Sequence, residues 1–166
     1  MIKNYLIAIA LLFSYLGFQG QIVAAENREI KMMSFDEFEP MLYQENDSIY
    51  IVNFWATWCA PCVREIPAFE SLNEKYKDQK VKVLLVSLDF PNQLESRVIP
   101  FVERMNMKSE VLLLNDPNSN RWIPLVSEEW TGAIPATVIY SKDFRGFYEQ
   151  EFHFEELEEI IKPLLN

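Results

Sequence analysis

The 166-residue sequence predicts an α/β fold in which a central mixed β-sheet is flanked by helices on both faces. Apolar strand-like runs alternate with amphipathic helix-like stretches through the middle of the chain, an order typical of parallel strands with right-handed crossovers. Nearer the C-terminus, two strand-like runs follow each other across a short polar turn, which predicts an antiparallel hairpin. The sheet should therefore contain both parallel and antiparallel pairs.

The first 25 residues have the layout of a secretory signal peptide. Lys3 precedes an apolar stretch over residues 5–18, and the segment ends in small residues up to Ala25. We expect cleavage after Ala25, which leaves residues 26–166 as one domain. An uncleaved anchor is the alternative, although a membrane span needs roughly 20 apolar residues. Either outcome predicts an exported protein, most simply in the periplasm, that is soluble or tethered by this segment.

The next elements are a short helix, a strand and a long helix. Residues 34–37 have capping-box spacing, and Pro40 should shorten or kink the helix that follows. The apolar, partly β-branched run 49–55 predicts a buried strand. Residues 60–77 carry apolar side chains at three-to-four spacing, which predicts an amphipathic helix that is kinked at Pro67.

The pattern continues with a strand over 81–88, a helix over 94–107 and a short strand over 111–114. Asp116 and Pro117 have the chemistry to cap a helical turn. The periodic pattern is then lost from Asn118 to Gly132.

The C-terminal part predicts a hairpin and a last helix. Two strands are expected over 136–140 and 146–152, joined by the polar turn 141–145. Apolar residues between Leu157 and Leu165 give the terminal helix its buried face.

Charge and cysteine content narrow the function. The formal net charge is -10, and removal of Lys3 with the first 25 residues makes it -11. An acidic surface repels phosphate backbones, so nucleic acid is not an expected partner. The two cysteines are three positions apart, and a disulfide between them would constrain the unfolded chain very little. The pair is therefore better explained by chemistry than by stability.

The segment Trp58-Cys59-Ala60-Pro61-Cys62 lies where a predicted strand ends and a helix begins. Residues three apart on a first helical turn share a face, so both sulfurs can reach bonding distance. The helix N-terminus favours a thiolate over a thiol. Cys59 is the predicted nucleophile, and Cys62 is the resolving thiol that attacks the mixed disulfide.

Residues 52–62, read as VNFWATWCAPC and followed by Glu65 and Pro67, resemble the WCxPCxxExP pattern of the exported TlpA/ResA-like branch of the thioredoxin superfamily. The resemblance extends over roughly residues 34–165 in element order. It implies a thioredoxin fold and thiol-disulfide oxidoreductase activity.

The same resemblance assigns a second part of the site to Gly132-Ala133-Ile134-Pro135-Ala136-Thr137. Pro135 corresponds to the family's cis-proline, and Ile134 to the neighbour that faces the substrate. The alternative is an ordinary trans proline that opens a strand, since only about 5–6% of X–Pro bonds are cis.

Substrate contacts are also expected from the motif itself, at Trp58, Ala60 and Pro61. Trp58 should form an apolar lip beside the nucleophile, while Trp55 is expected in the core. Packing is expected for Trp122 and Trp130, with partner binding as the alternative. His153, the only histidine, is expected to have no catalytic part.

The proton relay departs from the thioredoxin pattern because Asn53 stands where many thioredoxins have a buried Asp, and an amide does not titrate. Glu65 and Asp89 are the candidates. For Glu65 the alternative is a carboxylate that simply favours the start of a helix. Asp89 is offset by one residue from the acidic residue that ResA-like proteins carry near the end of this strand. The alternative for Asp89 is a carboxylate at a solvated strand end.

The resulting prediction is a disulfide oxidoreductase, acting as a reductase on client proteins and supplied with electrons by a membrane thiol carrier. We expect a monomer with no cofactor and no metal, because stable zinc sites usually need four ligands.

Two alternatives remain. One is a thiol-dependent module that binds clients or metal without turnover. The other is a thiol peroxidase, but Ala56 occupies the place where a peroxidase would need a threonine or serine.

Overall fold

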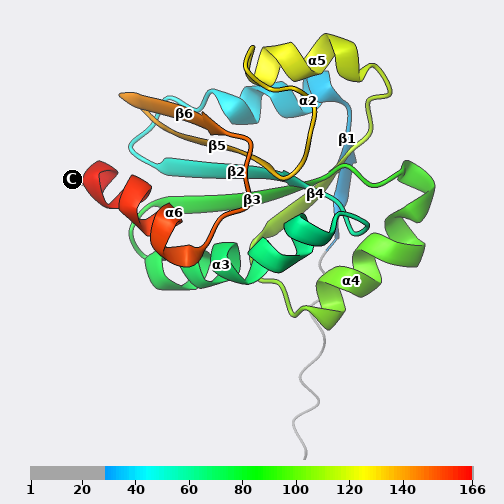
Figure 1. The fold of residues 1–166 in the computed structure, drawn as a ribbon, viewed down its shortest axis with the longest axis horizontal. Coiled ribbons are helices and arrows are strands. Elements are labelled where there is room, and N and C mark those ends of the chain that lie inside the picture. The colour runs from blue at the N-terminus through cyan, green and yellow to red at the C-terminus, as the bar shows by residue number, and fades with distance from the viewer. Residues whose placement is uncertain (1–28, 166) are drawn as a thin grey trace, which may run out of the picture.

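The computed structural model describes residues 29–165, which form one six-stranded mixed sheet in the order β1-β4-β3-β2-β5-β6 (Figure 1). The predicted signal peptide, residues 1–25, lies outside the described residues. The strands are β1 (Lys31–Met33), β2 (Ile49–Trp55), β3 (Val81–Ser87), β4 (Glu110–Leu114), β5 (Ala136–Ser141) and β6 (Phe144–Tyr148). The pairs β1·β4, β4·β3 and β3·β2 are parallel, whereas β2·β5 and β5·β6 are antiparallel.

Helices cover both faces of the sheet (Figure 1). On one face lie α3 (Ala60–Tyr76), α4 (Ile99–Arg104) and α6 (Phe154–Ile161), and on the other lie α2 (Phe35–Phe38) and α5 (Ser119–Val126). Successive side chains of a strand point to opposite faces, so Ile51 packs with the α3 layer while Val52 packs with the α2 and α5 layer. Both faces of β2 are therefore buried, which explains its continuous apolar run.

Short turns complete the chain: η2 (Glu39–Leu42), η3 (Pro91–Gln93), the π-helical turn η4 (Leu94–Val98) and η5 (Lys162–Leu164). The capping box at Ser34 and Glu37 is present, and the helix that it starts changes to the 3-10 turn η2, where Pro40 lies. Within residues 29–165, no helix combines the length and apolar character needed to cross a bilayer.

The prediction of one regular helix over 94–107 is wrong in its bounds and in its regularity. It begins as the π-turn η4 and continues as α4, which ends at Arg104. Pro100 has no N–H to donate to the preceding turn, which favours the wider π-turn before it. Asn106 has a φ of 50°, a left-handed conformation that stops the helix.

The predicted turn of the hairpin is also wrong. The strands are joined by Lys142 and Asp143 alone, and Ser141 pairs with Phe144. After Tyr148 the chain leaves the sheet, and Phe152 enters the core beside α3 and α6 instead of extending β6.

Two elements were absent from the prediction. Residues 119–126 form α5 even though Pro124 lies inside it, because Trp122 and Val126, one turn apart, bury the same face. Strand β1 has only three residues, too few to show a period in the sequence.

Candidate active site

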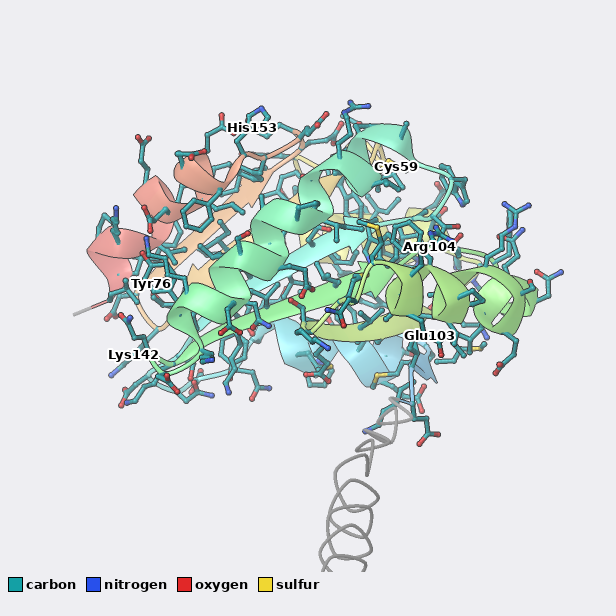
Figure 2. The ribbon with its side chains drawn as sticks, turned by 90° about the horizontal axis from the view of Figure 1, so that it is seen from below. Cys59, Tyr76, Glu103, Arg104, Lys142 and His153 are labelled. Carbon is teal, nitrogen blue, oxygen red and sulfur yellow. A yellow bond between two sulfur atoms is a disulfide. The ribbon has the colours of Figure 1, made fainter. Side chains whose placement is uncertain are left out.

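The two cysteines lie at the N-terminal end of α3, immediately beyond the end of β2. Figure 2 shows Cys59 at this end of α3 and Tyr76 at the opposite end. The segment from Ala56 to Cys59 is a turn in which the Cys59 N–H donates to the Ala56 carbonyl at 3.1 Å. Cys59 is the N-cap residue of α3, with extended backbone angles of φ -89° and ψ 102°. The strand therefore delivers Cys59 directly to the positive end of the helix dipole.

Cys59 and Cys62 are joined by a disulfide, with their Cα atoms 5.3 Å apart. The Cys62 N–H also points at the Cys59 sulfur, 3.3 Å away. In the reduced protein this N–H would donate to a Cys59 thiolate and lower its energy. Cys62 is fully buried and Cys59 is 6% exposed, so Cys59 is the sulfur that an incoming group can reach.

The Ile134–Pro135 peptide bond is cis, as the resemblance implied. The Ile134 carbonyl oxygen lies 3.7 Å from the Cys59 sulfur. Hydrogen bonds hold the preceding loop: Trp130 Nε1 donates to the Ala133 carbonyl at 2.7 Å, and the Thr131 N–H donates to Glu149 at 2.8 Å. Residues 75 positions apart are thus brought together at the disulfide.

Glu65 is buried, with 1% of its surface exposed, one turn beyond Cys62 on α3. Its carboxylate accepts from Asn53 Nδ2 at 2.8 Å and from the Phe152 N–H at 3.0 Å. Burial is the largest influence and raises the pKa of Glu65 from 4.5 to about 7, although both hydrogen bonds lower it. A carboxyl group that simply favours the start of a helix would be solvated, so that alternative does not describe Glu65.

Asn53 connects Glu65 to the strand that follows Pro135. Its Nδ2 also donates to Thr137 Oγ1 on β5 at 3.1 Å. Its Oδ1 is buried and has no hydrogen-bond partner within residues 29–165. Asn53 therefore ties β2, α3 and β5 together without titrating itself.

Asp89 is 2% exposed and is not a solvated strand end. Its carboxylate accepts from the Thr57 N–H at 2.9 Å, the Thr57 hydroxyl at 2.5 Å and the Ser87 hydroxyl at 2.8 Å. The partner Thr57 lies inside the turn that leads to Cys59, so Asp89 holds that turn against the end of β3.

The other predicted substrate-binding residues surround the disulfide unevenly. Trp58 is 56% exposed, Ala60 is exposed, and Pro61 and Ile134 are half-buried. Pro135 is buried.

The remaining aromatic residues follow their packing predictions. Trp55, Trp122 and Trp130 are all buried in the two cores. The His153 N–H donates to Glu156 at the start of α6, a capping contact.

Sequence reasoning missed the roles of Thr57, Thr137 and Phe152. Thr57 and Thr137 stand inside the quoted motifs, so their positions were visible but their partners were not. Phe152 contributes only its backbone N–H, which leaves no trace in the residue type.

Comparison with known proteins decides the family, because the family model described as AhpC/TSA matches residues 24–145. The chain belongs to the AhpC/TSA family. Its curated relatives include ResA thiol-disulfide oxidoreductases, which supports the resemblance to the TlpA/ResA-like branch of the thioredoxin superfamily.

Two curated relatives illustrate the likeness. The thiol-disulfide oxidoreductase ResA of Halalkalibacterium halodurans is 29% identical over 119 residues, covering 68% of this chain and 61% of the relative. The thioredoxin-like protein YneN of Bacillus subtilis is 36% identical over 63 residues, covering 38% of this chain and 36% of the relative. The chain thus spans between about a third and three fifths of these relatives' length.

Solved structures share the fold at lower identity. A thiol:disulfide interchange protein of the thioredoxin family from Chlorobium tepidum TLS superposes with a TM-score of 0.62 at 21% identity, over 77% of this chain and 85% of that one. StoA from Bacillus subtilis superposes with a TM-score of 0.54 at 22% identity, over 69% and 83% of the two chains. This AhpC/TSA chain therefore has a thioredoxin fold.

Proposed function

We propose that the protein is an extracytoplasmic thiol-disulfide oxidoreductase that reduces disulfides of client proteins. The observation that supports this most strongly is the Cys59–Cys62 disulfide at the N-terminus of α3, beside the cis peptide at Pro135. A structural disulfide closing so short a loop stabilises little, whereas a reversible one in this position has a chemical use.

In the proposed reaction the Cys59 thiolate attacks one sulfur of the client disulfide. A mixed disulfide forms and the other client sulfur leaves as a thiolate that takes up a proton. The Cys62 thiolate then attacks the Cys59 sulfur, which releases the second client thiol and leaves the protein with its Cys59–Cys62 disulfide. Two electrons pass to the client, and a membrane thiol donor returns two electrons to the protein.

Glu65 is the proposed proton acceptor for the Cys62 thiol. With a pKa of about 7, its carboxyl group can both take and return a proton near neutral pH. Asp89 is assigned to the turn before Cys59 instead, because its hydrogen bonds attach it to Thr57 inside that turn.

The direction of electron flow is proposed from the residues between the cysteines. Strong oxidants stabilise their reduced form by lowering the nucleophile's pKa. Ala60 and Pro61 carry no polar side chain that would add to the helix terminus in doing so. A reductase is the better match.

Export is proposed from residues 1–25, which would place the protein outside the cytoplasm, in the periplasm. An electron donor in the membrane follows from that location, because an oxidising compartment does not supply a reductant by itself. We propose that it works there as a monomer.

The thiol peroxidase alternative is the less favoured one. Ala56 is buried and offers no hydroxyl for a peroxide, and the Thr57 hydroxyl is engaged by Asp89.

Cysteine variants test the proposal. Purified protein supplied with dithiothreitol should reduce a protein disulfide. Cys59→Ser should abolish the reaction, and Cys62→Ser should accumulate a mixed disulfide with the client. Equal activity in the Cys59→Ser protein would refute the assigned roles, and consumption of hydrogen peroxide in preference to disulfides would favour the peroxidase.

A further inference from the structure

Five large hydrophobic side chains are clearly exposed within residues 29–165, and the most exposed are Phe90 at 66% and Trp58 at 56%. Tyr43, at 52%, has partners: its hydroxyl donates to the Leu125 carbonyl at 2.9 Å, and the Arg145 guanidinium lies 4.8 Å from its ring centre. Within residues 29–165, the side chains of Trp58 and Phe90 have no comparable ring contact or hydrogen bond. Both aromatic surfaces are thus available to a partner.

Trp58 and Phe90 lie at the same edge of the sheet as the disulfide. The chain after β3 runs beside the chain after β2, since the Leu88 N–H donates to the Trp55 carbonyl at 2.8 Å. The next link is between Asp89 and Thr57, through two hydrogen bonds of 2.9 and 2.5 Å. Trp58 and Phe90 are the residues that directly follow this linked pair, and Cys59 comes next after Trp58.

The backbone of Phe90 is fixed on both sides. Asp89, which precedes it, is buried and hydrogen-bonded, and Pro91, which follows it, restricts Phe90 to extended angles, here φ -64° and ψ 143°. The Phe90 carbonyl also accepts from the Gln93 N–H at 2.8 Å. Because the backbone is already fixed, binding at Phe90 has to order the side chain alone.

We propose that Trp58 and Phe90 form a docking rim for client polypeptides that carry an aliphatic or aromatic side chain next to the cysteine to be reduced. This rests on the proposed function. Aromatic side chains are enriched at protein interfaces, and Trp is among the residues that most often dominate binding energy. Since folded proteins bury such client side chains, the rim selects unfolded or partly folded clients.

The test uses two short peptides that differ in one residue, Leu or Ser beside a single cysteine, each as a disulfide-linked dimer. Hydroxyethyl disulfide is the small substrate that reaches the dithiol alone. Dithiothreitol-reduced and desalted protein is mixed with an excess of each, and the second-order rate constant of this single turnover is measured by acid quenching and chromatography. The wild type should prefer the Leu peptide over the Ser peptide.

In Phe90→Ser that preference should fall about tenfold, the effect expected for losing one aromatic contact. Phe90→Leu should restore much of it, because it returns an apolar surface. The matched control is Leu125→Ser, which removes an exposed apolar side chain on α5 and should keep the wild-type preference.

Equal preference in wild type and Phe90→Ser overturns the inference, and so does an equal loss on hydroxyethyl disulfide, which would indicate damage to the dithiol. A dimer in sedimentation equilibrium that Phe90→Ser dissociates would assign the rim to a second copy of this chain instead. Failure to reduce any disulfide, hydroxyethyl disulfide included, overturns the proposed function and the rim with it.

Discussion

Glu65 and Asp89 are both buried carboxylates, and their hydrogen-bond partners give them different tasks. Asp89 accepts hydrogen bonds from two hydroxyls and a backbone N–H, all belonging to the ends of β3 and the turn before Cys59. Glu65 accepts from an amide and a backbone N–H, and burial still dominates its pKa. One carboxylate thus fixes geometry, while the other is the one that we propose exchanges a proton with Cys62.

The raised pKa of Glu65 predicts how stability varies with pH. Between its unfolded value of 4.5 and its folded value of about 7, the native state binds more protons than the unfolded state, so the free energy of unfolding falls as pH rises. The Glu65 contribution to this fall is about 3 kcal/mol, at about 1.4 kcal/mol per pH unit. Glu65→Gln should lose this contribution when urea unfolding of the oxidised protein is measured from pH 5 to pH 8.

Glu159→Gln, which alters an exposed carboxylate of α6, is the control and should follow the wild-type pH dependence. A Glu65→Gln protein with the same slope as the wild type would show that Glu65 is ionised throughout this range. It would also remove the basis for Glu65 as the proton acceptor of Cys62.

The Asp89 contacts predict a stability effect that depends on the replacement. Asp89→Ala should lower the free energy of unfolding by about 1–3 kcal/mol, because the Thr57 N–H and two hydroxyls lose their buried acceptor. Asp89→Asn keeps an acceptor oxygen, so its free energy of unfolding should fall clearly less than that of Asp89→Ala. Urea denaturation measures both, with the exposed Asp78→Ala as control. Equal losses for Ala and Asn would mean that hydrogen bonding is not what Asp89 contributes.

Among the site residues, Cys59, Cys62 and Pro135 were predictable from the sequence because they stand at fixed positions in recognisable motifs. The burial of Glu65 and Asp89 was not predictable in the same way. Each is surrounded by residues distant in sequence, such as Phe152 for Glu65 and Thr57 for Asp89, and a carboxylate is normally exposed.

The helices α3 and α6 are joined by Glu158, whose carboxylate accepts from Lys75, Tyr76 and Lys162. These hydrogen bonds lower the pKa of Glu158 from 4.5 to about 2. The joint lies at the end of α3 opposite the cysteines, where Figure 2 labels Tyr76. It therefore supports the packing of α6 without touching the dithiol.

The lowered pKa of Glu158 predicts acid sensitivity of this joint. Its stabilisation is complete above the unfolded pKa of 4.5 and is lost as pH falls through about 2. Glu158→Gln should therefore lower the melting temperature at pH 7. The difference in melting temperature between this variant and the wild type should become smaller as the pH falls toward 2. A constant difference over this range would contradict the assignment.

The elements that were predicted well are those with a long, regular pattern. Strand β2 was predicted at its observed bounds, and α3 and β3 to within one residue, because each is buried along its whole length or on one continuous face. Strand β1 has three residues, which are too few to show a period in the sequence. Helix α5 has eight residues, and Pro124 inside it argues against a helix in the sequence. Tertiary packing on the sheet decided both.

At the scale of the whole molecule, residues 29–165 form one sheet between two layers of helices (Figure 1). The core on the α2 and α5 side is strongly aromatic. Trp122 is 4% exposed and stacks on Phe35, with ring centres 5.7 Å apart, and it contacts Trp130 edge to face at 5.5 Å. A segment that shows no period in the sequence is therefore anchored by its tryptophans, which explains why α5 forms.

Trp122 and Trp58 offer a paired test of this arrangement. Trp122→Ala should lower the free energy of unfolding by about 3–5 kcal/mol because it leaves a cavity between α5 and the sheet. Trp58→Ala, at an exposed position, should change it by less than about 0.5 kcal/mol. Both are measured by guanidinium denaturation. Similar losses for the two variants would mean that the α5 layer contributes little to stability.

The proposed function requires that Cys59 and Cys62 form a reversible redox couple poised for reduction of clients. The reduction potential of this couple is obtained by equilibrating the protein in dithiothreitol redox buffers and in the more oxidising glutathione buffers, and by counting alkylated cysteines by mass spectrometry. We expect a two-electron transition near the value of thioredoxin, about -270 mV. A potential near -120 mV would assign oxidase work instead, and a disulfide that never equilibrates with the buffer would contradict the account altogether.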